Sequence, residues 1–155
     1  MTYTLFIYLY DGRLFFTGCL NLYFEKYKGI GPGYYDRPIM ALPKNCSAED
    51  VSAAIQHCVI EMEEHRDSIY QDNSQYDIMQ MDKRIFQNFK LFGVNASRKK
   101  IIQKSIGVMI RKRENEFMLG RYVPDGRDMI TQKKLYLSPN SSILEVSQIV
   151  LELLG

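Results

Sequence analysis

The chain has 155 residues, of which 46% are hydrophobic, and its formal net charge is +2. This length suits one domain with a sizeable core, residues 1–155. A charge so close to zero gives no reason by itself to expect nucleic-acid binding.

The three cysteines, Cys19, Cys46 and Cys58, form no CxxC pair and no Cys/His ligand spacing. We therefore expect reduced, mostly buried thiols and no metal site, which favours the reducing cytosol. The apolar N-terminal run ends at Asp11-Gly12-Arg13 and has no basic segment before it, so it resembles neither a signal peptide nor a membrane span. We expect a cytoplasmic protein without a membrane partner.

The first third of the chain predicts strands. Residues 4–10 and 14–17 are rich in β-branched and aromatic residues, and the Asp11-Gly12 pair between them predicts a hairpin. Residues 19–28 are mixed, and we expect a short turn or a helical piece there. Gly and Pro punctuate residues 29–33, which predicts a loop. Residues 39–42 are expected to form a short strand.

The middle third predicts helices. Residues 48–66 place apolar side chains at helical spacing, and residues 78–92 do so again before Gly93, a typical helix stop. We expect a loop at residues 68–76 and a short helical piece at 96–103. The expected buried positions are Val51, Ile55, Cys58, Val59 and Met62 in the first helix, and Ile78, Met81, Ile85, Phe89 and Phe92 in the second.

The last third predicts strands at residues 106–110, 117–123 and 135–137, separated by turns at 113–116 and 124–128. A final helix is expected at residues 143–154.

A strand-to-helix junction occurs twice, 95 residues apart, with Leu, Asn, Ser, Val and Ser at matching positions. In each copy a serine, Ser47 or Ser142, precedes an acidic residue by three positions, which is a helix-capping pattern. Residues 1–60 and 104–155 are therefore candidates for an internal duplication, although strand-to-helix junctions also converge on this pattern. We predict an α+β fold: an antiparallel sheet built from two strand-rich units, each ending in a helix, with a helical insertion between them.

Charge is segregated along the chain. Residues 61–82 hold seven acidic residues and one basic residue, whereas residues 83–113 hold ten basic residues and no acidic one. Neighbouring solvated faces that complement each other would explain this, and so would a surface polarised for docking a charged macromolecule.

No catalytic pattern is present in the sequence. There is no GxSxG or HExxH motif, and the glycine-rich residues 29–33 lack the Lys-Ser/Thr of a phosphate-binding loop. His57 and His65 are expected to be surface residues. We predict no catalytic residues, no metal and no cofactor. The alternatives are a small nucleic-acid-binding domain that uses the basic clusters in residues 98–113, a small enzyme of unrecognised type, or a structural subunit of another assembly.

Several stretches together resemble the immunity proteins of bacterial contact-dependent growth inhibition systems, in particular a family with two related strand-rich halves. The likeness covers most of the chain but not residues 61–96. It is carried by residues 12–16 (GRLFF), residues 29–33 (GIGPG), Leu42-Pro43, residues 104–108 (KSIGV) and the terminal helix after Ser142.

The resemblance implies a non-enzymatic cytoplasmic inhibitor that binds the C-terminal toxin domain, commonly a nuclease, of a cognate exported protein. It implies no direct contact with nucleic acid. Inhibitors of basic nucleases are often acidic overall, and this chain is not, so a local acidic segment would have to attract a basic toxin. The candidate toxin-binding residues are two tyrosines after the glycine-rich segment (Tyr34, Tyr35), acidic residues (Glu63, Glu64, Asp67, Asp72, Asp77) and residues around a predicted hairpin turn (Arg121, Tyr122, Asp125, Arg127, Asp128).

Overall fold

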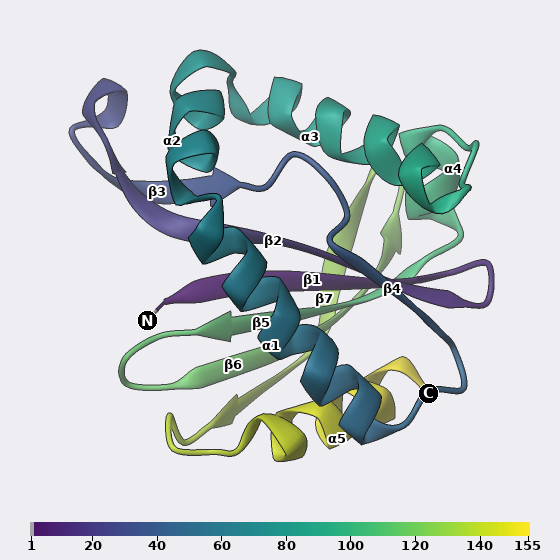
Figure 1. The fold of residues 1–155 in the computed structure, drawn as a ribbon. Coiled ribbons are helices and arrows are strands. Elements are labelled where there is room, and N and C mark those ends of the chain that lie inside the picture. The colour runs from purple at the N-terminus through teal and green to yellow at the C-terminus, as the bar shows by residue number, and fades with distance from the viewer. Residues whose placement is uncertain (1) are drawn as a thin grey trace.

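One seven-stranded antiparallel sheet separates two groups of helices (Figure 1). The computed structural model describes residues 2–155. Along the sheet the order is β3-β2-β1-β5-β6-β7, and β4 also pairs with β2. The strands are β1 (Tyr3–Tyr10), β2 (Arg13–Phe24), β3 (Gly29–Tyr34), β4 (Met40–Pro43), β5 (Ile106–Lys112), β6 (Phe117–Asp125) and β7 (Asp128–Leu137). The predicted α+β class is confirmed.

The helices cover the sheet on both faces. They are α1 (Ala48–Glu64), α2 (Arg66–Gln75), α3 (Ile78–Gln87), α4 (Arg98–Gln103) and α5 (Ile143–Leu154), with short 3₁₀ turns η1 (Glu25–Tyr27) and η2 (Asn88–Phe92). One core lies between the sheet and α1, α5 and the start of α2. A second core lies between the sheet and α3, η2 and α4. In Figure 1, α1 and α5 cross the front of the sheet.

Successive side chains along each strand pack alternately into the two cores. Side chains of a strand point in turn to opposite faces, so Leu5 and Ile7 of β1 enter the first core while Tyr8 packs against the second. In β2, Phe16 enters the first core and Phe15 the second, and both are fully buried. The uninterrupted apolar runs in these strands therefore reflect burial on both sides.

The local signals for the hairpin and the helix starts are confirmed. Asp11 and Gly12 both have positive φ, 51° and 75°, as a two-residue turn between twisted strands requires. Ser47 Oγ accepts from the Asp50 N–H at 3.1 Å, and Asp50 Oδ2 accepts from the Ser47 N–H at 3.1 Å. In the last helix Ser142 Oγ accepts from the Glu145 N–H at 3.1 Å.

Predictions for residues 19–33 are only partly right. The expected short turn or helical piece in residues 19–28 is present as η1, but strand β2 continues to Phe24, and the predicted loop at residues 29–33 belongs to strand β3. Pro32 is tolerated because β3 is an edge strand, where no outward partner needs its missing N–H. A Cβ at Gly33 would lie 2.8 Å from Leu22 Cδ1 and 3.0 Å from Ile69 Cγ2. Glycine at this position therefore lets α2 approach the sheet closely.

The secondary structure of two polar segments, and the burial of one residue in α3, also differ from prediction. Residues 68–76, expected to form a loop, belong mainly to helix α2, whose only buried residues are Ile69 and Asn73, one turn apart. Strand β7 starts at Asp128 instead of residue 135, and most of its side chains are exposed. In α3, Ile78 was expected in the core but is 55% exposed, and Phe86 is buried instead. An edge strand and a helix with a narrow buried face give weak apolar patterns, which explains these errors.

The two halves have corresponding strand orders. Central strands β1 and β5 pair with each other, β2 and β6 lie outside them, and β4 and β7 lie on the outer sides of β2 and β6. Helices α1 and α5 follow β4 and β7 and contact each other. The internal duplication itself stays a prediction.

Candidate functional site

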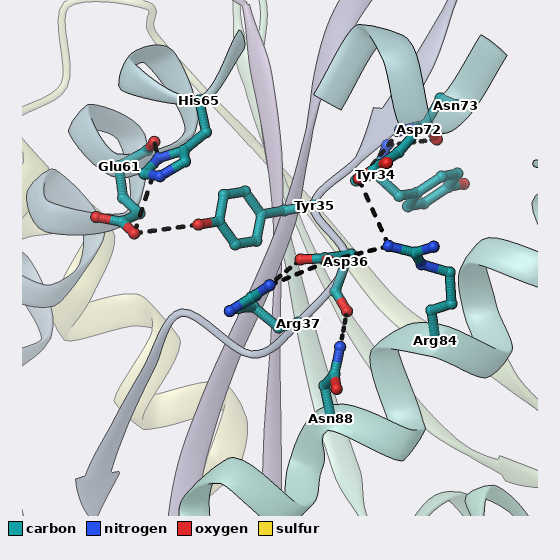
Figure 2. Close-up of polar contacts among 10 residues, drawn as sticks. All are labelled: Tyr34, Tyr35, Asp36, Arg37, Glu61, His65, Asp72, Asn73, Arg84 and Asn88. Carbon is teal, nitrogen blue, oxygen red and sulfur yellow. Dashed lines mark hydrogen bonds and ion pairs between the residues drawn. The ribbon is translucent and has the colours of Figure 1, made fainter. Parts of the chain in front are cut away.

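The most extensive polar junction lies where the sheet edge is interrupted between β3 and β4 (Figure 2). The connecting segment still follows β2, because the Tyr35 N–H donates to Gly18 O at 3.0 Å and the Ile39 N–H donates to Phe16 O at 2.7 Å. Side chains from α1, α2, α3 and η2 reach this segment. It therefore joins the sheet to four elements from the first two thirds of the chain.

Asn73 of α2 holds the start of the segment. Its Oδ1 accepts from the Tyr34 N–H at 3.0 Å, and its Nδ2 donates to Tyr34 O at 2.9 Å and to Ile69 O at 2.7 Å. The buried amide thus satisfies both backbone groups of Tyr34, as a neighbouring strand would. The Tyr34 ring packs against the second core, and burial, together with nearby Cys19 and Asp82, raises its pKa to about 12.

Asp36 holds the middle of the segment. Its carboxylate accepts from Arg37 Nε at 2.8 Å and from Arg84 Nη2 at 3.2 Å, and its carbonyl accepts from Asn88 Nδ2 at 2.7 Å. Burial alone would raise the pKa of Asp36, but the two guanidinium groups outweigh it and hold that pKa below the usual range. Arg84 also lies 3.7 Å from Asp72, so it links α3 to α2.

Tyr35 points to the opposite face. Its ring is 6% exposed and sits in the first core, and its hydroxyl donates to Glu61 Oε1 at 3.1 Å. Burial, and to a lesser degree Glu61, raises the pKa of Tyr35 to about 12. His65 meets the Tyr35 ring edge-on with centroids 5.6 Å apart. A polar pocket of about 320 Å³ opens here, lined by Tyr35, Asp36, Arg37, His65, Ser68, Ile69 and Asp72.

The two predicted tyrosine anchors are not presented on an exposed turn. Tyr34 ends a strand and Tyr35 follows it, so their rings alternate into different cores. A candidate binding tyrosine after a glycine-rich loop would be exposed, but the glycine-rich segment is strand β3 and directs both rings inward. Both tyrosines therefore contribute to the cores, Tyr35 to the first and Tyr34 at the edge of the second.

Three of the five acidic candidates gather at the junction of α1 and α2, which we call the acidic junction: Glu63, Glu64 and Asp67. Glu63 forms an ion pair with Arg66 at 2.7 Å. Glu64 and Asp67 are exposed, and neither forms an ion pair within residues 2–155. Of the other two, Asp72 lines the polar pocket.

Asp77 lies apart from the acidic junction and caps α3. Its Oδ1 accepts from the Gln80 N–H at 2.8 Å, and Gln80 Oε1 accepts from the Asp77 N–H at 2.9 Å. The Asp77 carboxylate therefore has a role in the start of that helix.

The five candidates around the β6–β7 turn do not form one patch. Arg121 donates to Leu153 O and, at 2.7 Å, to Gln132 Oε1, so it ties β6 to the end of α5. Tyr122 points to the other face of the sheet, where its hydroxyl lies 4.0 Å from Met109 Sδ. Asp125 and Arg127 are exposed at the turn, and Asp128 pairs with Arg98 at 3.1 Å.

Arg98 connects the elements around a second hollow. This hollow of about 830 Å³ lies between α3, α4 and the β6–β7 turn. Arg98 donates to Asp82 of α3 and to the Arg127 carbonyl, the latter at 2.7 Å, in addition to Asp128. Burial raises the pKa of Asp82 despite the nearby Arg98 charge.

The basic clusters at residues 98–113 are not one surface. Arg98 is neutralised by two carboxylates, and Arg111 and Lys112 point to opposite faces of β5. Sequence reasoning missed the roles of Asp36, Asn73, Arg84 and Arg98. Each acts on groups at least 16 positions away along the chain, and no local pattern signals such a contact.

The three cysteines are free, and Cys19 and Cys58 are buried, as expected. Among residues 2–155, no cluster of three or more His, Cys, Asp and Glu side chains could hold a metal ion. None of the described helices is long and apolar enough to span a bilayer.

Comparison with known proteins finds no matching family model and no matching curated protein. Among solved structures the chain is similar to a protein of unknown function, NMB0488, from Neisseria meningitidis, with 13% sequence identity and a TM-score of 0.59. The match covers 99% of this chain and 93% of the other. The likeness is one of fold. The fold is therefore shared with a protein of unknown function.

Proposed function

We propose that this chain is a non-enzymatic immunity protein that binds and neutralises the C-terminal toxin domain of a cognate contact-dependent growth inhibition system. The toxin domain is a nuclease in this proposal, and binding takes place in the cytoplasm. The proposal starts from the family resemblance of the sequence. It is supported by one feature of the structure, the acidic junction between α1 and α2.

The acidic junction combines exposed charge with a rigid support. Glu64 and Asp67 project from helix ends that are fixed to the sheet through Tyr35 and Asn73. Exposed carboxylates attract a basic partner during encounter. A support that is already ordered before binding lowers the entropy cost of the complex. A basic nuclease surface fits both properties.

The polar pocket beside the acidic junction carries side chains that can form hydrogen bonds with the toxin domain. Arg37 and Ser68 are exposed lining residues, and His65, which directly follows α1, lines the pocket as well. Such groups form hydrogen bonds that fix the orientation of a partner after charge has brought it close. The acidic junction then determines the rate of encounter, and the pocket contributes to the lifetime of the complex.

Co-expression tests the proposal. The toxin domain encoded by the adjacent reading frame is induced in a host cell with and without this chain. We expect growth arrest without the chain and normal growth with it, whereas a toxin domain of an unrelated system should still arrest growth. Arrest by the adjacent toxin domain despite abundant, folded chain would refute the proposed function.

A further inference from the structure

The face of β5, β6 and β7 that points away from α1 and α5 carries a distinctive set of side chains. Leu119 and Leu135 lie in or against the first core, so their neighbours along each strand point to the opposite face. Cross-strand pairing aligns Arg111 with Met118 and Met118 with Tyr136. We call this surface the open face: Met109, Arg111, Tyr122, Lys134 and Tyr136, which surround the buried side chain of Met118.

Helix coverage of the open face is limited to one end. Of the helical insertion, α4 packs against β6 and β7, and Ile102 of α4 lines a hollow with Tyr122. Towards Tyr136 the open face is accessible, and that ring is 58% exposed. Lys134 is also exposed.

Charge on the open face is mainly positive. Arg111 and Lys134 are its charged residues, and Glu116, two residues before Met118, lies at its end near the β5–β6 turn. Arg111 Nε is buried and has no hydrogen-bond partner within residues 2–155. A buried cationic donor without an acceptor is unusual in a folded protein. Nε itself is closed to a ligand, but the Arg111 side chain as a whole is only half-buried and forms no ion pair within residues 2–155, so its positive charge is left for an anion at the surface.

Two tyrosines flank this positive charge. The Tyr122 ring lies over Gly120, where a Cβ would come within 2.9 Å of Tyr122 Cε2. Glycine at that position therefore makes room for the ring against the sheet. Together with the exposed Tyr136 ring, this arrangement provides two aromatic surfaces on adjacent strands, beside Arg111 and Lys134.

We propose that the open face binds single-stranded nucleic acid, with Arg111 and Lys134 contacting phosphates and Tyr122 and Tyr136 stacking on bases. Aromatic rings on a sheet surface, combined with nearby basic groups, bind unpaired bases in a sequence-tolerant way. A duplex keeps its bases stacked and would leave both rings unused. An acidic protein segment would satisfy the charges but not the two rings. This site goes beyond the proposed function and departs from the expectation of no direct nucleic-acid contact.

Fluorescence anisotropy with labelled oligouridylate of about twelve nucleotides tests this site. We expect a dissociation constant between about 1 and 100 µM at moderate salt. Replacing Lys134 with Gln should lower the slope of log K against log salt by about 0.7, the share of one phosphate contact. Tyr136→Ala should weaken binding between about 5- and 150-fold, the range expected for losing one stacked base.

Matched controls come from the same chain. Lys133 precedes Lys134 on β7 but lies opposite Arg121 on the helix-covered face, so Lys133→Gln should change little. Tyr23 is 54% exposed on β2, at the other end of the sheet, so Tyr23→Ala should bind as wild type does. Circular dichroism of each variant checks folding.

Three results would overturn the proposal. The first is no anisotropy change at protein concentrations up to about 0.5 mM, above the range of non-specific binding. The second is equal effects of the variants and their controls, and the third is competition by polyglutamate as strong as that by unlabelled oligouridylate. None of these results depends on toxin binding, so the proposed function is judged separately.

Discussion

At the scale of single residues, Asn73 and Asp36 order the interrupted sheet edge in different ways: Asn73 satisfies backbone groups of the edge, and Asp36 binds side chains that reach it. Asn73 supplies both an acceptor and a donor to the Tyr34 backbone, and Asp36 accepts from Arg37 and Arg84. Both residues are polar, and neither lies within a recognisable motif. Their contribution to the fold comes from the groups they contact.

We predict that Asn73→Ala lowers the free energy of unfolding by about 2 kcal/mol, because it leaves two backbone groups of Tyr34 without partners. Chemical denaturation measures this. The matched control is the neighbouring Ser74→Ala, which removes one exposed hydrogen bond to Tyr70 O and should cost clearly less. Equal costs for both variants would show that water replaces the Asn73 amide.

We predict that stability depends on pH through Asp36. Its pKa is below the usual 3.8 in the folded protein, so the charged carboxylate stabilises the fold above that value, and this contribution is lost as the pH falls through the lowered pKa. Asp36→Asn should therefore be less stable than wild type at neutral pH, and the difference should shrink on acidification below 3.8. Denaturation series at several pH values measure it, and a difference that grows on acidification would contradict the assignment.

At the scale of elements, the helix starts were predictable because their signals are local. A serine three positions before an acidic residue predicted both caps, and the hydrogen bonds of Ser47 and Ser142 confirm them. The extent of β2 and the existence of β3, α2 and most of β7 were not predictable in the same way. Pro32 at a sheet edge and the mostly polar side chains of α2 and β7 conceal elements that tertiary contacts stabilise.

We predict that Ser47→Ala and Ser142→Ala each lower the free energy of unfolding by about 1 kcal/mol, because each removes an acceptor for an N–H of the first helical turn. Ser141→Ala is the control, since the observed contact of Ser141 uses its backbone N–H. Thermal or chemical melts measure these costs. Cap variants that unfold together with the control would refute the stabilising role of the caps.

The candidate site shows the same division between local and distant information. The acidic residues Glu63, Glu64 and Asp67 were predictable as a group because they are close in sequence and lie on consecutive helices. Tyr34 and Tyr35 were misplaced because the strand before them was read as a loop. The residues that order the junction, such as Arg84, act on partners 48 positions away, which one sequence does not reveal.

At the scale of the whole molecule, the sheet separates two surfaces of different charge. The acidic junction belongs to α1 and α2, and these helices pack on one face of the sheet. The open face carries Arg111 and Lys134 on the other side of the same sheet. Net charge near zero therefore hides two local regions of opposite sign. In our account the toxin domain binds at the acidic junction, and it does not cover the open face.

The central claim is that the acidic junction brings the toxin domain to this chain. The measurement is the association rate constant, by stopped flow, of the purified chain with the toxin domain of the adjacent reading frame. We predict that Glu64→Lys with Asp67→Lys slows association at least about tenfold and reduces its salt dependence, because exposed charges act mainly on encounter. The control pair Glu114→Lys with Glu152→Lys, also exposed, should change the rate much less. Equal association rates for both pairs would contradict this account.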